Sequence, residues 1–378
     1  MPVLEPEYSL RWPRELFKWE AERLLALGDE GLVMSAVGQL VNEAFEEDDA
    51  QDNFFRSMAT VRNVFDTQSD VASRPRIEKW LAALFADEKI ANQRGEPEYW
   101  AQRHGYSDPV TKEAGTSAVD SFSSFIEEMS YLGYFPRVLP KQCVDDRDWS
   151  GDAAGTKISR SVRLKITWPI PADEAASYPV EKLFSLIEYF HDQAYRPRLP
   201  GELHPFGGCG PHYSDWNKES GTAVYRWRVN ELLEAHGLDV RLSKNPGEQG
   251  RLTSVLPQPL EKVVEKQLES RRDDPADEVA HALRDFRARS AGRPQKVAAL
   301  GLLAGQLERR RDLLKSSLQR GDEASLFDIA NNYAIRHRND RQKSEYGDEY
   351  LNWIFNLYVS SIQLIDDLDH RQSARPHS

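Results

Sequence analysis

The sequence predicts a mostly helical protein with a helical N-terminal region (1–140), a small α+β middle region (157–256) and a C-terminal helical bundle (257–370). Three observations lead to this division. Apolar residues recur at three- and four-residue steps in the first 135 residues, the period changes to two after residue 160, and helical spacing returns from Pro257. With nine Trp, 14 Tyr and 15 Phe in 378 residues, the chain can bury more than one core.

The N-terminal region carries four apolar stripes of the kind that a helix buries on one face. They are Leu16–Trp19–Leu24, Phe54–Met58–Val61–Phe65, Ile77–Trp80–Leu81–Leu84 and Phe122–Phe125–Ile126–Met129. The polar stretch 145–156 contains glycine and indicates a linker or exposed loop. We therefore expect this region, whose role the sequence does not indicate, to end near residue 140.

The middle region begins with a change of period. Val162, Leu164, Ile166 and Trp168 alternate with polar residues, which predicts a half-buried strand that ends at Pro169. A helix is expected over about 180–194. The stretch 196–221 is rich in Pro and Gly and predicts a loop.

A second helix and a hairpin complete the middle region. The helix runs through 225–233 and ends at Gly237, because glycine tolerates the left-handed conformation that ends many helices. Alternating residues at 238–242 and 252–256 flank a turn and predict a β-hairpin. From Pro257 onward we expect helices, with breaks near 273–275, 293–294 and 320–321, and a disordered tail from about Arg371.

Several functional classes are excluded by the sequence. No window approaches the roughly 18 uninterrupted apolar residues of a membrane helix, and the N-terminus lacks a basic stretch followed by an apolar run. Two cysteines, Cys143 and Cys209, are too few for a disulfide framework, so a cytoplasmic location without membrane contact is expected. We find no phosphate-binding Walker loop, dinucleotide fingerprint or nucleophile elbow, and therefore expect no cofactor.

The formal charge of −12 hides an asymmetry. Residues 284–343 contain 14 Lys or Arg and seven Asp or Glu, a local charge of +7, so the rest of the chain carries −19. A basic run of this kind is most often a solvated helix face, and the alternative is a surface for anions such as RNA.

Four candidate metal ligands lie in or near the Pro- and Gly-rich stretch: His191, His204, Cys209 and His212. Cys209 and His212 have a spacing that can bring two donors to one zinc ion, but the second closely spaced pair of known zinc sites is missing. We therefore predict that His204, Cys209 and His212 do not converge on a metal. The glycines between them offer a different possibility, an anion-binding nest of backbone N–H groups.

A second candidate is the run Tyr225-Arg226-Trp227-Arg228. Neighbours on a helix point about 100° apart, so the four side chains cannot form one continuous surface. We expect Tyr225 or Trp227 to be buried. Arg226 and Arg228 then lie at the rim, where each can meet a phosphate or a carboxylate.

The most informative polar cluster lies near the end of the basic segment and comprises Asn331, Asn332, Arg336, His337, Arg338, Asn339 and Arg341. An imidazole near neutrality can move a proton from a ribose 2′-hydroxyl, and an arginine can hold the scissile phosphate. The hypothesis assigns acid/base work to His337 and phosphate contact to Arg336, Arg338 and Arg341. In this hypothesis Asn331, Asn332 and Asn339 orient the substrate, and Asn332 lies at the catalytic centre. The alternative is a structural histidine on a solvated basic face.

With these residues, the stretch 294–365 resembles the helical HEPN-like C-terminal domains of bacterial abortive-infection proteins. The likeness rests on residues 330–337 and the aromatic helix 350–358, and extends back through 230–242, so that it covers about 221–365. It implies a four- to five-helix bundle with Trp353, Ile354 and Leu357 in or beside the core. It also implies a homodimeric, metal-independent endoribonuclease of phage defence or stress response.

The active members of that family carry an Arg-x4-6-His motif, and this sequence departs from it. The expected arginine positions hold Ala330, Asn331 and Asn332, and the arginine is Arg336, directly beside His337. Two adjacent side chains on a helix diverge by about 100°, which disfavours a shared phosphate within one subunit. A dimer can bring Arg336 or Arg338 of one chain to His337 of the other. A non-catalytic helical interaction module or scaffold is the alternative function.

Overall fold

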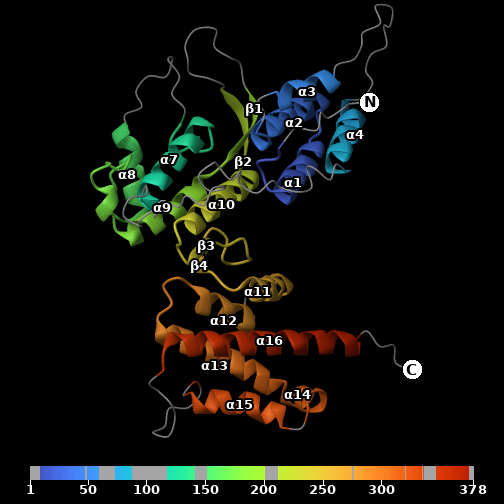
Figure 1. Ribbon diagram of the computed structural model, residues 1–378, viewed down its shortest axis with the longest axis vertical. Helices are drawn as coiled ribbons and strands as arrows, with labels where there is room; N and C mark the ends of the chain where they lie inside the picture. Colours follow the sequence, from blue (N-terminus) through green and yellow to red (C-terminus); the bar gives the residue numbers. More distant parts are fainter. Residues whose placement is uncertain are drawn as a thin grey trace, which may run out of the picture. The chain divides into compact units, whose positions relative to one another are not determined.

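The computed structural model describes residues 9–46, 49–58, 73–86, 117–140, 151–200, 212–274, 276–319, 321–333, 335 and 346–373. The predicted mostly helical class is confirmed. Helices dominate these stretches, and their strands form two separate two-stranded antiparallel sheets (Figure 1).

The chain forms two compact units, 1–228 and 229–378. The boundary falls within helix α10 (Lys218–Ala235), between the two region boundaries predicted from the sequence. Each unit is described separately below.

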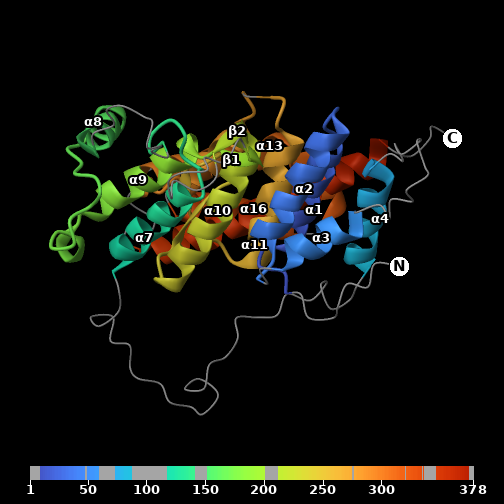
Figure 2. The same ribbon diagram turned by 90° about the horizontal axis from the view of Figure 1, so that it is seen from above.

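The first unit opens with four helices, α1 (Arg14–Leu25), α2 (Glu30–Ala44), α3 (Ala50–Met58) and α4 (Ser73–Ala86). Helix α2 contacts the other three, and the four lie side by side in Figures 1 and 2. Phe54, Trp80 and Leu84 of the predicted stripes are buried, and the rings of Phe54 and Trp80 meet at 5.1 Å between centroids. Val61 and Phe65 lie outside the described residues.

The unit continues with α7 (Ala118–Tyr131), α8 (Gly151–Val162), the 3₁₀-helix η1 (Ala175–Ser177) and α9 (Val180–Gln193). Helix α7 begins at Ser117, whose hydroxyl accepts a hydrogen bond from the backbone N–H of Asp120 while the Asp120 carboxylate bonds back. The predicted stripe of α7 is buried, and the rings of Phe122 and Phe190 join α7 to α9.

The strand predicted over 162–168 is wrong, and so is the linker predicted over 151–156. Helix α8 occupies 151–162 and ends where Arg163 adopts a left-handed φ of 57°. The chain then turns back, because the Ser159 hydroxyl bonds both the N–H and the C=O of Ile166. Ile166 is buried whereas Leu164 is 36% exposed, so the apolar alternation marks a turn packed on its own helix.

The loop predicted over 196–221 is also wrong at both ends. Strands β1 (Arg196–Pro200) and β2 (Tyr213–Asn217) pair antiparallel, with Arg196 opposite Asn217 and Pro197 opposite Trp216. A ribbon of two strands tolerates prolines, because each strand has a partner on one side only. The buried side chain of Arg196 holds β1 against α1 and α2, as detailed below.

The predicted hairpin in the second unit is confirmed. Strands β3 (Val240–Leu242) and β4 (Leu252–Ser254) pair antiparallel, and Gly237 ends α10 with a left-handed φ of 62°. The Asn230 side chain attaches β3 to α10, because it accepts from the N–H of Leu242 at 2.7 Å and donates to the Leu242 carbonyl oxygen at 3.2 Å.

Among the described residues, the helices that follow in the second unit are α11 (Gln258–Ser270), α12 (Glu278–Arg287), α13 (Arg293–Arg309), α14 (Arg311–Ser317), α15 (Asp322–Asn332) and α16 (Asp348–Ser373). Three junctions lie close to the predicted breaks, whereas the break at Arg310 and the end of α15 at Asn332 were not predicted. The helices enclose one apolar core, in which the rings of Phe286 and Phe355 stack 4.0 Å apart. Helix α16 crosses α11 and α13, and Figure 1 shows it as the longest helix of this unit.

The predicted burial along α16 is correct for two residues and wrong for the third. Ile354 is fully buried and Leu357 packs against the core, whereas Trp353 is 47% exposed. Leu351, Ile354 and Tyr358 lie on the buried face of α16, three or four residues apart. Trp353 directly precedes Ile354, so its side chain points about 100° away from that of Ile354 around the helix axis. Helix α16 continues to Ser373, so the disorder predicted from about Arg371 is wrong for residues 371–373, and residues 374–378 lie outside the described residues.

Among the described residues, no helix is long and apolar enough to cross a membrane, in agreement with the sequence.

Candidate functional site

The described part of the polar cluster lies at the end of α15. Asn331 and Asn332 form its last turn and are exposed, and Tyr333 ends the helix by donating its N–H to the Ile329 carbonyl oxygen at 3.1 Å. The predicted residues Arg336, His337, Arg338, Asn339 and Arg341 lie outside the described residues. The structure therefore locates the flanks of the predicted site.

Both flanks of the segment 336–345 are attached to the bundle at one place. On the N-terminal side, Ile335 is 8% exposed and belongs to the apolar core. On the C-terminal side, the Tyr346 hydroxyl donates a hydrogen bond of 2.7 Å to the Tyr333 carbonyl oxygen. Desolvation raises the pKa of Tyr346 against the opposite effect of Arg293, so the hydroxyl keeps the proton that this bond requires.

Four rings gather at this attachment, and we call Tyr333, Tyr346, Tyr350 and Trp353 the aromatic cluster. The Tyr333 ring lies 5.2 Å from that of Tyr346, 5.7 Å from that of Tyr350 and 6.1 Å from that of Trp353. Tyr346 and Tyr350 are 5.8 Å apart. These are ordinary separations for interacting aromatic pairs, so α15 and α16 hold the rings as one packed group.

Two cations of α13 lie beside the aromatic cluster. The Arg293 guanidinium lies 4.4 Å from the centre of the Tyr346 ring and 3.3 Å from Asp348, and the Lys296 ammonium lies 3.4 Å from the same carboxylate. Asp348 therefore engages both cations, which weakens their attraction for a polyanion.

Several arginines of the basic segment form ion pairs with carboxylates of other elements. Arg287 is 1% exposed and bonds Glu248 at 3.1 Å and Glu261 at 2.8 Å. Three exposed or partly exposed arginines also meet carboxylates, in the pairs Arg309–Glu278, Arg310–Asp366 and Arg311–Glu323. By sequence, the flanked segment 336–345 holds four Lys or Arg and two acidic residues, Asp340 and Glu345, a net charge of +2.

The α10 candidates are placed largely as expected. Tyr225 is fully buried, and its hydroxyl donates to the Ile187 carbonyl oxygen at 3.0 Å. Arg228 meets a carboxylate, because its two terminal nitrogens bond the two oxygens of Glu128 at 3.2 and 2.9 Å. Arg226 is half-buried. Binding of RNA by Arg226 or Arg228 stays a prediction.

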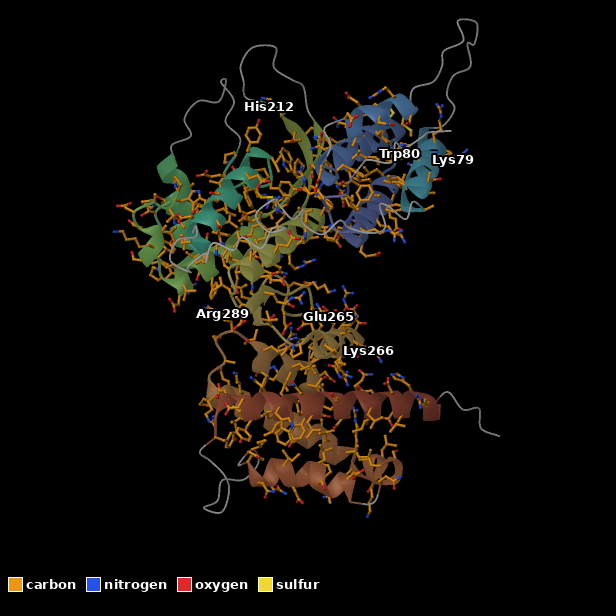
Figure 3. All side chains as sticks on the ribbon, in the orientation of Figure 1. Lys79, Trp80, His212, Glu265, Lys266 and Arg289 are labelled. Atoms are coloured by element: carbon orange, nitrogen blue, oxygen red, sulfur yellow. The ribbon has the colours of Figure 1, made fainter. Side chains whose placement is uncertain are left out.

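The candidate metal ligands are only partly described, since His204 and Cys209 lie outside the described residues. His212 lies just before β2 (Figure 3), at the edge of a half-open cavity of about 150 Å³ whose walls include Tyr213 and Trp216. Buried His191 has its Nδ1 3.2 Å from Asp192. No group of three potential metal ligands occurs among the residues that the structure describes.

The first unit contains a buried ionic network that the sequence analysis did not predict. Glu20 of α1 accepts hydrogen bonds from Arg196 at 2.9 Å, from Arg198 at 3.3 Å and from the Ser220 hydroxyl. Glu43 of α2 accepts from Arg196 at 3.0 Å and from the Tyr134 hydroxyl at 3.1 Å. The one available signal was the position of Glu20 on the face of α1 that buries Phe17, Ala21 and Leu24.

This network balances two arginines against two carboxylates. Desolvation lowers the pKa of Arg196, but the attraction of Glu43 and Glu20 outweighs it and raises that pKa overall, so Arg196 stays charged. The network joins α1 and α2 to β1 and α10 and explains how β1 can carry two buried arginines.

Comparison of this chain with protein-family models, with curated proteins and with solved structures found no match.

Proposed function

We propose that the unit 229–378 is an RNA-directed module that acts through residues 331–343, in bacterial phage defence or stress response. The observation that carries this proposal is the aromatic cluster, which lies where both flanks of the segment 336–345, of net charge +2, meet the bundle. Cationic side chains bind phosphates and aromatic rings bind bases, and proteins that hold single-stranded RNA combine the two.

The proposed activity is metal-independent RNA cleavage with His337 as the acid/base. Neutral imidazole takes the proton of a ribose 2′-hydroxyl, whose oxygen attacks the adjacent phosphorus as the bond from phosphorus to the 5′-oxygen breaks. The imidazolium so formed returns the proton to the leaving 5′-oxygen. Arg336 and Arg338 hold the phosphate and offset the charge of the transition state, while Asn332 orients the ribose. The products are a 2′,3′-cyclic phosphate and a 5′-hydroxyl end.

A homodimer is part of this proposal because Arg336 and His337 are adjacent in the sequence. If the segment is helical, their side chains diverge by about 100°, and one phosphate is reached more easily by His337 of one chain and an arginine of a second. Mixing two inactive variants tests this. Chains carrying His337→Ala and chains carrying Arg336→Ala together form mixed dimers with one intact composite site, so we expect partial recovery of cleavage. No recovery in demonstrated mixed dimers would exclude the shared site.

The central test is His337→Ala, with His281→Ala as the matched control. His281 is exposed on α12 and pairs with Asp285 at 3.2 Å, away from the proposed site in sequence. We expect His337→Ala to abolish RNA cleavage with an unchanged Tm and to keep RNA binding, while His281→Ala cleaves normally. Cleavage by the wild type should persist in a chelator. A lower Tm for His337→Ala that accounts for lost activity would instead make His337 structural.

Arg336→Ala tests the phosphate contact through its effect on RNA binding. Loss of one phosphate contact is expected to weaken RNA binding and to make the log–log salt dependence shallower by about one unit. Arg272→Ala is the control, because Arg272 is an exposed arginine paired with Glu269 on its own helix. Equal salt slopes for both variants would show that Arg336 does not contact the RNA backbone.

The second candidate function is a non-catalytic interaction module or scaffold. It is favoured by the ion pairs of the bundle, because Arg287, Arg309, Arg310 and Arg311 are each engaged by carboxylates. Wild-type protein that neither binds nor cleaves RNA at low salt, with or without chelator, would exclude the RNA proposal and favour this function.

A further inference from the structure

We propose that the turn between β3 and β4, residues 243–251, is attached to α11 and α12 in a pH-sensitive manner: the attachment is tightest while Glu248 carries a proton and loosens when Glu248 ionises. The proposal concerns a conformational property of the unit 229–378 and is independent of RNA binding. It rests on a buried cluster of three charged side chains, Glu248, Glu261 and Arg287.

The first observation is the geometry of this cluster. Arg287 of α12 is 1% exposed and donates to Glu248 of the turn at 3.1 Å and to Glu261 of α11 at 2.8 Å. Glu248 also accepts a hydrogen bond of 3.0 Å from the Ser243 hydroxyl. Both carboxylates are buried, so a single guanidinium joins the turn to two helices almost without contact with water.

The second observation is an excess of carboxylates. When Glu248 and Glu261 are both ionised, two negative charges face the one positive charge of Arg287. Oε1 of Glu248 and Oε2 of Glu261 accept no hydrogen bond from the described residues. A buried charge without compensation is costly, so a carboxylate in such a site takes up a proton more readily than it does in water.

Glu248 is the group that we expect to take up this proton. Desolvation raises its pKa, and the charge of Glu261 adds to the rise. Arg287 and hydrogen bonds from within the turn oppose the rise without cancelling it. Glu248 also lies on a turn, which can carry its carboxylate outward into water, whereas Glu261 lies inside α11.

The other charged groups at the turn are half-buried or exposed. Arg284 of α12 donates to the Pro246 carbonyl oxygen at 3.2 Å. Lys244 of the turn pairs with Glu265 of α11 at 3.4 Å, and Arg251 at the end of the turn is exposed. The carboxylate buried beneath the turn therefore responds mainly to the two charges that share its site.

The direction of the pH dependence follows from the raised pKa. A carboxylate whose pKa is higher in the closed state than in the open state favours closure below its ordinary pKa, near 4.3. That contribution is lost as the pH rises through the raised value. One proton changes the ratio of closed to open molecules by up to about tenfold per pH unit. We therefore expect the attachment to weaken as the pH rises and to level off once Glu248 is ionised.

Hydrogen exchange of the full-length protein tests the proposal at the backbone amides of Gly250 and Arg251, which donate hydrogen bonds within the turn. After correction for intrinsic exchange, the wild type should lose protection at these amides between about pH 4.5 and 8. Glu248→Gln is neutral at every pH, so its protection should hardly vary and should exceed that of the wild type at the upper end. Glu261→Gln removes the excess carboxylate and should reduce the loss.

Glu269→Gln is the matched control, since Glu269 is exposed on α11 and pairs with Arg272 at 3.1 Å. It should lose protection with pH as the wild type does. Constant protection in the wild type, or an equal loss in Glu248→Gln, would overturn the proposal. Carbon-13 NMR titration of the Glu248 carboxyl in the wild type decides the question even if a variant fails to fold. A pKa clearly above about 4.3 supports the proposal, and an ordinary pKa overturns it.

Discussion

Glu20 shows how much a single buried carboxylate can hold together. Its side chain is fully buried, and it accepts hydrogen bonds from Arg196, Arg198 and Ser220, which lie on β1 and α10. Neutralising it would remove the carboxylate that the two buried guanidinium groups share, whereas Glu43 bonds Arg196 alone of the two. Removal of one partner from a buried ion pair costs more than the pair contributes, because the remaining charge stays desolvated.

We therefore expect Glu20→Gln to lower the free energy of unfolding of the first unit by about 3–5 kcal/mol. Glu22→Gln is the control, as Glu22 is exposed on the same helix, and its effect should stay within about 0.5 kcal/mol. Denaturant unfolding of the two variants measures both. Similar midpoints for Glu20→Gln and the wild type would contradict the assigned role of the network.

Asp366 predicts how stability depends on pH. Desolvation opposes ionisation of this carboxylate, but hydrogen bonds from Arg271 at 2.7 Å and Arg310 at 2.6 Å outweigh it, so its pKa lies below the ordinary value. A carboxylate whose pKa is lower in the folded state stabilises the fold above its unfolded pKa, near 4. That stabilisation is lost as the pH falls through the folded pKa.

Asp366→Asn is accordingly expected to destabilise the second unit by about 1–2 kcal/mol at pH 7 and by less at about pH 3. Urea unfolding at the two pH values gives the comparison. Asp369→Asn, at an exposed position of the same helix, serves as the control. A deficit for Asp366→Asn that is equal at both pH values would show that the two arginine bonds are not responsible.

At the scale of elements, two glycines experience opposite constraints. Gly237 ends α10 with a φ of 62°, and Gly305 lies inside α13; a Cβ atom at either position would meet no atom within 4 Å. Steric clashes with neighbours are thus absent, and backbone conformation alone decides the effect of a substitution. Left-handed φ disfavours any residue with a Cβ, whereas helical φ favours alanine over glycine.

The same substitution should therefore have opposite signs at the two sites. Gly237→Ala is expected to destabilise by about 1 kcal/mol, and Gly305→Ala to stabilise by about 0.5–1 kcal/mol. Gly237→Asn should cost less than Gly237→Ala, because asparagine tolerates the left-handed region better. Thermal unfolding of the three variants is the measurement. Stabilisation by Gly237→Ala would mean that α10 ends differently in solution.

At the scale of the whole molecule, each unit has an apolar core of its own. Leu84 is fully buried in the first unit and Ile354 in the second. Truncating a buried aliphatic side chain to alanine costs about 2–5 kcal/mol, and in a protein with two cores that cost falls on the unit that contains the cavity.

Calorimetric unfolding should accordingly resolve two transitions. Leu84→Ala lowers the temperature of one, and Ile354→Ala lowers that of the other. The double variant should show both shifts, since Leu84 and Ile354 belong to different compact units. A single transition that both substitutions lower equally would show that the units unfold together, with α10 as the shared element.

How much was predictable depended on the range of the interactions involved. Apolar periodicity located most described helices, since a helix is specified by residues three and four apart. Gly237 and the β3–β4 hairpin were predictable for the same reason, because turn chemistry acts over a few residues. The stretch 162–168 failed because period two is also compatible with a turn, and the Ser159 hydroxyl bonds to Ile166 favour the turn.

For the candidate site too, the features set by local sequence were predictable and those set by long-range contacts were not. By itself, the sequence determined the helical class, the basic segment and the identities of the polar residues 331–341. Only the tertiary structure decided that Tyr333 and Tyr346 meet, that Trp353 is exposed beside them, and that Arg196 is neutralised by Glu20, 176 positions away. Such contacts depend on which helix faces pack together. The burial of large apolar surfaces determines which helix faces pack together. The individual residues that meet across those faces show no periodic pattern in the sequence.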